Sequence, residues 1–80
     1  MMHSSVITPE QALVYMTDCT LATVEDMAKE HKGTPEYERQ IGIAQYGCNW
    51  LEKMHIDLWD TRANDIIGKT TVKEWAKQYE

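Results

Sequence analysis

The sequence lacks the features that mark several large classes of protein. Two cysteines among 80 residues are too few for a disulfide framework, and no apolar run approaches the roughly 20 residues of a membrane span. Basic residues are in the minority, with 8 against 13 acidic ones and a net charge of −5. Because nucleic-acid backbones are bound by basic surfaces that release counterions, this balance disfavours a nucleic-acid partner. We also expect no membrane partner.

Motifs for metal binding, phosphate binding and catalysis are missing too. Structural zinc ligands arrive in close pairs, whereas Cys19, His31, Cys48 and His55 are separated by 11, 16 and 6 residues. The segment 68–70 reads Gly-Lys-Thr but has no upstream glycine at the spacing of a Walker motif. We therefore expect no metal, no cofactor and no enzymatic activity.

Length and composition favour a single helical domain over residues 1–80. The hydrophobic fraction of 42% and the charged fraction of 26% are typical of a globular protein. Residues 1–7 have neither a basic segment nor a cleavage-site pattern, so we interpret them as a flexible leader rather than a secretory signal. Without an export signal, we expect the protein in the cytoplasm, where both cysteines stay reduced.

Two threonine–proline pairs predict where two long helices begin. Thr8 and Pro9 open a first helix over 9–32, and Thr34 with Pro35 opens a second helix over 35–55. A linker of one or two residues makes the two helices an antiparallel hairpin.

Apolar residues at helical spacing predict the faces that these helices bury. In the first helix they are Ala12, Leu13, Met16, Cys19, Val24, Met27 and Ala28. In the second they are Tyr37, Ile41, Ala44, Cys48 and Leu51, widened by Ile43, Tyr46, Trp50 and Met54. If residues whose numbers sum to 67 lie at the same height, Cys19 packs beside Cys48 and the two can be crosslinked by oxidation. Gly42 and Gly47 predict close approach of another backbone.

The C-terminal third predicts two further short helices, over 61–67 and 71–79. Thr71 and Glu74 form the capping box of the second one. Since no segment alternates with period two, the fold class is all-α: a long antiparallel helical hairpin covered by two short C-terminal helices. Residues 61–80 also read as a helix-turn-helix, which leaves a small DNA-binding regulator as an alternative function. Few basic residues and a short glycine-to-valine spacing weigh against that alternative.

The connector between the hairpin and these helices carries the candidate partner-binding residues. They are Asp57, Leu58, Trp59, Asp60 and Arg62. Trp59 has two interpretations: it plugs the open end of the hairpin, or it anchors a partner, since tryptophan dominates interface hot spots.

Several segments of the chain resemble small accessory proteins of tailed bacteriophages and prophages. These segments are TLATVEDMA (20–28), YERQIGIAQ (37–45) with WL (50–51), TRA (61–63) and VKEWA (72–76). The resemblance covers residues 20–76 and implies host takeover or counter-defence, by blocking a host enzyme or by sequestering signalling nucleotides. It matches no motif with an assigned role, so no ligand-binding residue is carried over from it.

From the residues and this resemblance we expect a non-enzymatic inhibitor that binds a host protein, such as a bacterial defence component. A second alternative is an oligomeric sponge for a signalling nucleotide, with Lys29, Lys32 or Arg39 facing its phosphates. We also expect a homodimer or small homo-oligomer, because the core is small and the apolar stripes exceed what one hairpin can cover.

Overall fold

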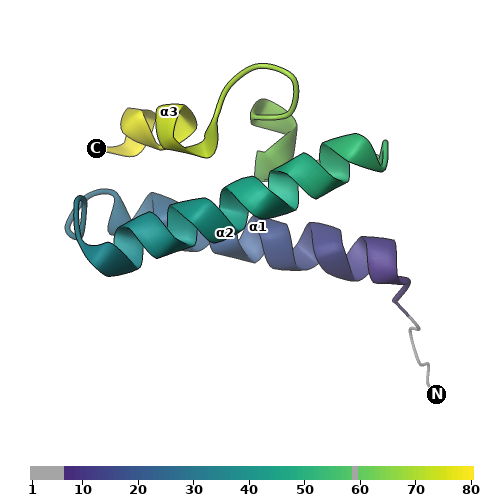
Figure 1. Cartoon of the computed structure of the whole chain (residues 1–80), viewed down its shortest axis with the longest axis horizontal. Helices are drawn as coiled ribbons and strands as arrows, with labels where there is room; N and C mark the ends of the chain where they lie inside the picture. Colours follow the sequence, from purple (N-terminus) through teal and green to yellow (C-terminus); the bar gives the residue numbers. More distant parts are fainter. Residues whose placement is uncertain (1–6, 59) are drawn as a thin grey trace.

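Two long antiparallel helices and a short C-terminal layer make up the fold of the computed structural model (Figure 1), which describes residues 7–58 and 60–80. The helices are α1 (Pro9–Met27) and α2 (Pro35–Lys53). The 3-10 helix η1 (Arg62–Asp65), the helix α3 (Val72–Ala76) and the 3-10 helix η2 (Lys77–Tyr79) follow. The predicted all-α hairpin is therefore confirmed, while residues 1–6 of the predicted leader lie outside the described residues.

Threonine side chains fix the starts of all three α-helices. The Thr8 hydroxyl accepts a hydrogen bond from the Gln11 N–H, and the Gln11 side chain accepts one from the Thr8 N–H, each at 3.1 Å. Thr34 and Thr71 accept from the N–H groups of Tyr37 and Glu74 in the same way. These caps satisfy donors that have no partner inside the helix.

The helix ends differ from those predicted. The chain leaves α1 at Met27 rather than at residue 32, and residues 28–34 form turns that include Gly33 at φ +84°. The last predicted turn of the helix is therefore part of the connection to α2. Helix α2 ends at Lys53, two residues early, with His55 in the left-handed region at φ +56°.

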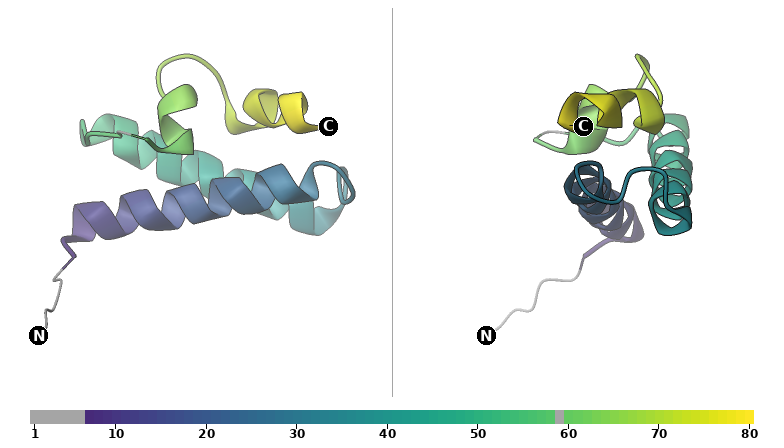
Figure 2. Two further views of the ribbon diagram at one scale, coloured as in Figure 1. Left: turned by 180° about the vertical axis from the view of Figure 1, so that it is seen from behind. Right: turned by 90° about the vertical axis from the view of Figure 1, so that its left-hand side faces the viewer.

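The C-terminal segment is less regular than predicted. The first of its two helices is reduced to the 3-10 helix η1, and the second begins one residue late as α3 and continues as η2. This segment lies along one side of the hairpin, across both long helices (Figure 2).

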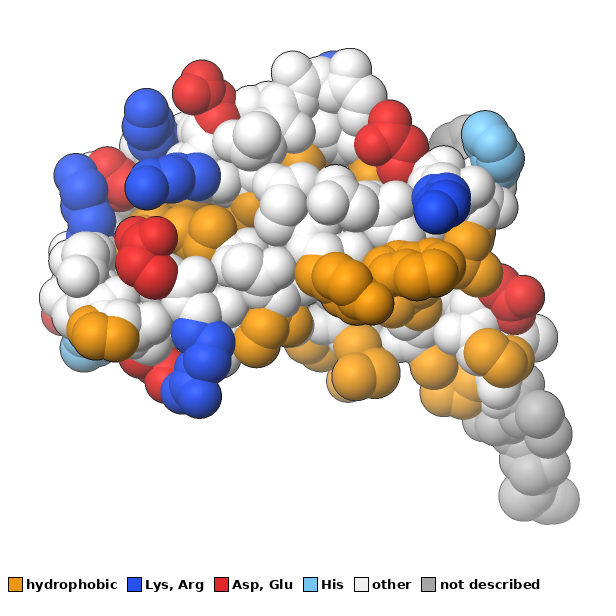
Figure 3. Space-filling view, in the orientation of Figure 1, with side chains coloured by type: hydrophobic (Ala, Val, Ile, Leu, Met, Phe, Trp, Pro, Cys, Tyr) orange, Lys and Arg blue, Asp and Glu red, His pale blue; other side chains and the backbone are white. Residues whose placement is uncertain are grey.

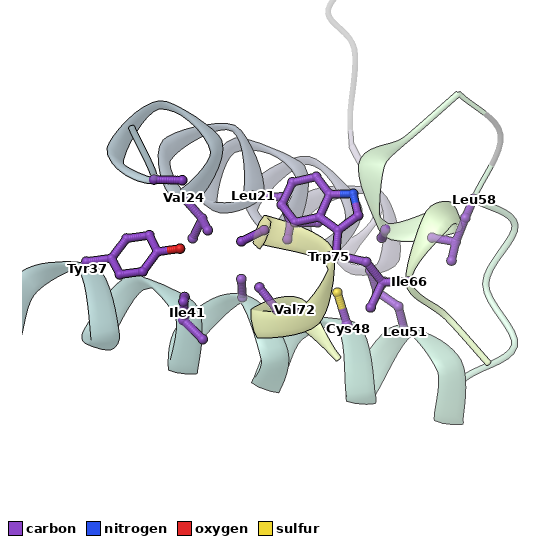
Figure 4. Close-up of a cluster of buried hydrophobic side chains, with 14 residues drawn as sticks. Leu21, Val24, Tyr37, Ile41, Cys48, Leu51, Leu58, Ile66, Val72 and Trp75 are labelled. Atoms are coloured by element: carbon purple, nitrogen blue, oxygen red, sulfur yellow. The ribbon is translucent and has the colours of Figure 1, made fainter. Parts of the chain in front are cut away.

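The core lies between this layer and the two long helices. Helix α1 contributes Leu21 and Val24, and α3 contributes Val72 and Trp75, whose side chains point toward α1 and α2 (Figure 4). The apolar stripe predicted for α2 is buried as expected: Tyr37, Ile41, Ala44, Cys48 and Leu51 are each at most 8% exposed.

Candidate functional site

Helix α1 has two apolar faces, and the stripe predicted for it enters the core only in part: Val24 and Ala28 are buried as expected, whereas Met16 and Cys19 are not. The buried positions at helical spacing are Thr17, Leu21, Val24 and Ala28. Met16 is 65% exposed and Cys19 is also exposed, although both belong to the predicted stripe. The second face of α1 therefore points away from the C-terminal layer.

The helices are also offset from the predicted register. A Cβ added to Gly47 would lie 2.4 Å from the Thr17 Oγ1, so Thr17 rather than Thr20 is level with Gly47. The pairing of Cys19 with Cys48 is wrong, because Cys19 is exposed while Cys48 is 1% exposed. At Gly47 α1 does come close, though through the side chain of Thr17 and not through its backbone, whereas a Cβ on Gly42 would meet no other described residue within 4 Å.

The uncovered side of the hairpin carries a group of exposed apolar side chains, which we call the hairpin face. It consists of Met16 of α1, Ile43, Tyr46 and Trp50 of α2, and the C-cap residue Met54, with the half-buried Leu13 of α1 at its edge. Figure 3 shows hydrophobic side chains gathered over α2 and the neighbouring edge of α1. Ile43, Tyr46, Trp50 and Met54 were predicted to be buried, yet they are 41–66% exposed.

A shallow groove of about 230 Å³ runs between the two helices on this side. Leu13, Met16 and Thr20 line it from α1, and Ile43 and Tyr46 line it from α2. Its floor is the contact of Thr17 with Gly47, where a side chain on residue 47 would separate the helices. The absence of a Cβ at Gly47 thus brings the two rows of apolar side chains together.

Two aromatic residues form the most prominent part of the hairpin face. The Tyr46 and Trp50 rings meet edge to face, with centroids 6.2 Å apart at 65°. The Lys53 Nζ lies 5.5 Å from the centroid of the Trp50 ring, a cation–π distance. Residues 40–51 of α2 include no charged residue, so the centre of the face is uncharged and Lys53 stands at its end.

Contacts of charged residues hold the C-terminal layer against the side of the hairpin that lies opposite the hairpin face. Arg62 donates from its backbone N–H to Asp18 Oδ1 at 2.8 Å and from Nε to Glu25 Oε2 at 3.1 Å. The hydrogen bond to Glu25 raises the pKa of Arg62 above its ordinary value. Lys32 pairs with Glu80 at 2.8 Å and joins the end of the chain to the turn of the hairpin.

The residues predicted to bind a partner from the connector do not form one surface in the structure. Leu58 is 8% exposed and belongs to the core, and Arg62 is engaged with α1. Asp57 and Asp60 are exposed, with Asp60 at φ +55°, and Trp59 lies outside the described residues. Leu58 and Arg62 thus hold the connector against the hairpin, and they are not presented beside the two aspartates as one surface.

The alternative sites gain little from the geometry. Helix α3 has five residues, and Val72, Trp75 and Ala76 are buried, so the helix offers little surface for reading DNA. Lys32 is paired with Glu80, and Arg39 is paired with Glu36 on its own helix.

Burial decides the chemistry of the buried thiol. Burial raises the pKa of the Cys48 thiol to about 11, which keeps it protonated near neutral pH. Within residues 7–58 and 60–80, no three His, Cys, Asp or Glu side chains come together as a metal site.

The comparisons with known proteins give no match. No protein-family model, curated protein sequence or solved structure matches the chain. Among the helices of the described residues, none has the length and apolar character needed to cross a lipid bilayer.

Sequence reasoning missed the hairpin face as a site, although its residues were all recognised as apolar. The available signal was the width of the apolar pattern on α2, which extends from Tyr37 on one side to Tyr46 on the other. A stripe that wide must either be covered on both sides or leave part of itself in solvent.

Proposed function

We propose that this protein acts by binding another protein through the hairpin face, rather than by catalysis, and that its effect is inhibition of a host protein. The observation that carries the proposal is the set of large apolar side chains at 41–66% exposure, of which Met16, Ile43 and Tyr46 line one groove and Trp50 packs against Tyr46. Contiguous apolar patches on a protein surface mark interaction sites, whereas single exposed apolar residues need no explanation.

The composition of the face supports a protein as its partner. Tryptophan and tyrosine are the side chains enriched at the centres of protein interfaces, where truncation of one anchor costs about 2 kcal/mol or more. Tyr46 and Trp50 are already in contact, so a partner meets a partly organised surface. Methionine at Met16 and Met54 adds flexible side chains that adapt to a partner's shape.

Inhibition by occlusion is consistent with this arrangement. A protein that covers a functional surface of its target needs a contact area and no reacting groups. Because segments of the sequence resemble phage accessory proteins, we look for the target among the proteins of a bacterial host, with defence components as the first class to test.

The experiment uses the full chain with a photoreactive benzoylphenylalanine in place of Tyr46. Lys69 of the C-terminal layer, which is also exposed, carries the same group in the matched control. After irradiation in bacterial lysate, we expect an adduct of this chain with a host protein from position 46 and none from position 69. The same adducts from both positions, or adducts from position 69 alone, would refute the hairpin face as the binding surface.

A second measurement tests the energetic role of the face. The double variant Tyr46→Ser with Trp50→Ser should keep its helical circular dichroism, because both side chains are exposed. Capture of the crosslinked host protein should fall about tenfold or more, since two anchors are removed. Equal capture by the variant and the wild type would contradict the proposal.

A further inference from the structure

The outward side of α2 carries a regular repeat that the core does not use. Its positions alternate at spacings of three and four residues, and we call them the α2 seam: Glu36, Arg39, Ile43, Tyr46, Trp50 and Lys53. This spacing is the heptad pattern through which two helices pack along a shared seam. The seam lies wholly outside the core, and the side chains of its three apolar members are exposed.

The seam is complementary to itself when read in the opposite direction. We place a two-fold axis between Ala44 and Gln45 of the two copies. Each seam residue of one copy then meets the seam residue of the other copy for which the two residue numbers add up to 89. Ile43 then faces Tyr46, Arg39 faces Trp50, and Glu36 faces Lys53. Each of the three layers occurs twice, as a symmetric dimer requires.

The chemistry of the layers fits this pairing. The central layers are apolar and aromatic, and the next ones place an arginine guanidinium against an indole ring, which is a favourable stacking contact. The outer layers join a carboxylate to an ammonium group. In a parallel pairing each residue would meet its own copy, so Glu36, Arg39 and Lys53 would each face a like charge.

The isolated chain satisfies the charged seam residues only with neighbours on the same helix. Glu36 pairs with Arg39 three residues away, and Lys53 lies over the ring of Trp50. Both contacts can be extended by a second copy without breaking a contact to the core. The seam is about 27 Å long at the rise of an α-helix, and the groove lined by Met16 and Leu13 runs beside it.

We infer that the hairpin face binds a second copy of this chain, with the two α2 helices antiparallel along the seam. The inference rests on the proposed function only in that both need the hairpin face to bind a protein. A second copy and a host protein would compete for the same side chains, so the dimer would have to dissociate before the face could bind a host protein. The inference commits to a copy of this chain because the charges at the two ends of the seam complement each other. The dimer would be a four-helix arrangement with both C-terminal layers on the outside.

The test measures the dimer dissociation constant of the full chain by sedimentation equilibrium. The single variants Glu36→Lys and Lys53→Glu each place like charges in both outer layers, so each should raise this constant about tenfold. The variant that combines both changes restores opposite charges and should return to within about threefold of the wild type. Glu74→Lys and Lys77→Glu are matched controls, because that exposed pair lies on the C-terminal layer and should leave the constant unchanged.

Each outcome separates this inference from the proposed function. A wild-type chain that stays monomeric at high micromolar concentration refutes the dimer, while a host adduct from position 46 would leave the proposed function standing. A dimer that ignores both charge changes uses another surface and refutes the seam. A dimer that responds as expected, with no host adduct, supports the seam and counts against the proposed host target.

Discussion

The contact between Thr17 and Gly47 gives the sharpest test of how the hairpin is packed. Replacement of Gly47 by alanine would place a Cβ 2.4 Å from the Thr17 Oγ1 and 3.1 Å from its Cγ2. Both distances are below normal van der Waals separation, so the helices must move apart or Thr17 must change rotamer. Overpacking of this kind costs about 1–3 kcal/mol.

A matched control lies five residues away on the same helix. Gly42→Ala places its Cβ where no described residue outside the local helix backbone lies within 4 Å. Both substitutions gain about 1 kcal/mol of helix propensity, so their difference isolates the clash. We expect Gly42→Ala to raise the free energy of unfolding by up to about 1 kcal/mol. Gly47→Ala should be about 1–3 kcal/mol less stable than Gly42→Ala.

Urea denaturation followed by circular dichroism measures both free energies, and a double-mutant cycle with Thr17→Ala identifies the contact. Thr17→Ala removes the Oγ1 and Cγ2 atoms, so it should stabilise the Gly47→Ala variant while it destabilises the wild type. The coupling energy should be about 1–3 kcal/mol. Equal stabilities of the two glycine variants, or a coupling below about 0.5 kcal/mol, would show that the helices do not meet at this point.

Three further predictions test other parts of the fold. His55 closes α2 in the left-handed region at φ +56°, with the Ile56 N–H bonded to the Leu51 carbonyl, so His55→Gly should raise the free energy of unfolding by about 1 kcal/mol in urea titrations. The Trp75 indole N–H is buried with no hydrogen-bond acceptor among the described residues, so Trp75→Phe should cost well under the roughly 3–5 kcal/mol of Trp75→Ala, and equal losses would contradict this. Burial raises the pKa of the Cys48 thiol from 9.0 to about 11, so the native state keeps a proton that the unfolded chain releases in this range. The contribution of Cys48 to the free energy of unfolding is therefore fully present below pH 9. It is lost as the pH rises to 11, at about 1.4 kcal/mol per pH unit, and a Cys48→Ala variant measured over the same range should lack this contribution to the slope.

The starts of the helices could be predicted from the sequence, whereas their ends could not. A cap such as Thr8 or Thr34 acts on an N–H group three residues away, so its effect is contained in the local sequence. The end of α1 was missed because the prediction took Gly33 as the position next to the helix end, whereas the turns begin at Ala28 and Gly33 lies within them. The end of α2 was missed because a histidine occupies the left-handed position that glycine normally marks.

The sequence also revealed both apolar stripes of α1 in part but not which of them enters the core. Leu21 lies in the core stripe and was not among the predicted core residues, while Met16 was predicted to be buried and is exposed. The side chain of Arg62, 44 residues further along the chain, bonds to Asp18 beside the core stripe. The choice between the stripes therefore depends on a contact distant in sequence, which helical periodicity does not contain.

The contrast between the two outer surfaces of the molecule is the strongest argument that the hairpin face is an interface. On the outer surface of the C-terminal layer, several exposed residues are charged, as on an ordinary solvated surface: Lys69, Lys73, Glu74 and Lys77. On the other side of the hairpin, exposed α2 positions instead carry Ile43, Tyr46 and Trp50. Both surfaces belong to one small domain, so general composition cannot explain the difference. Charged residues return toward the ends of the α2 seam, and its two end residues, Glu36 and Lys53, have opposite signs, as an antiparallel pairing of two copies requires.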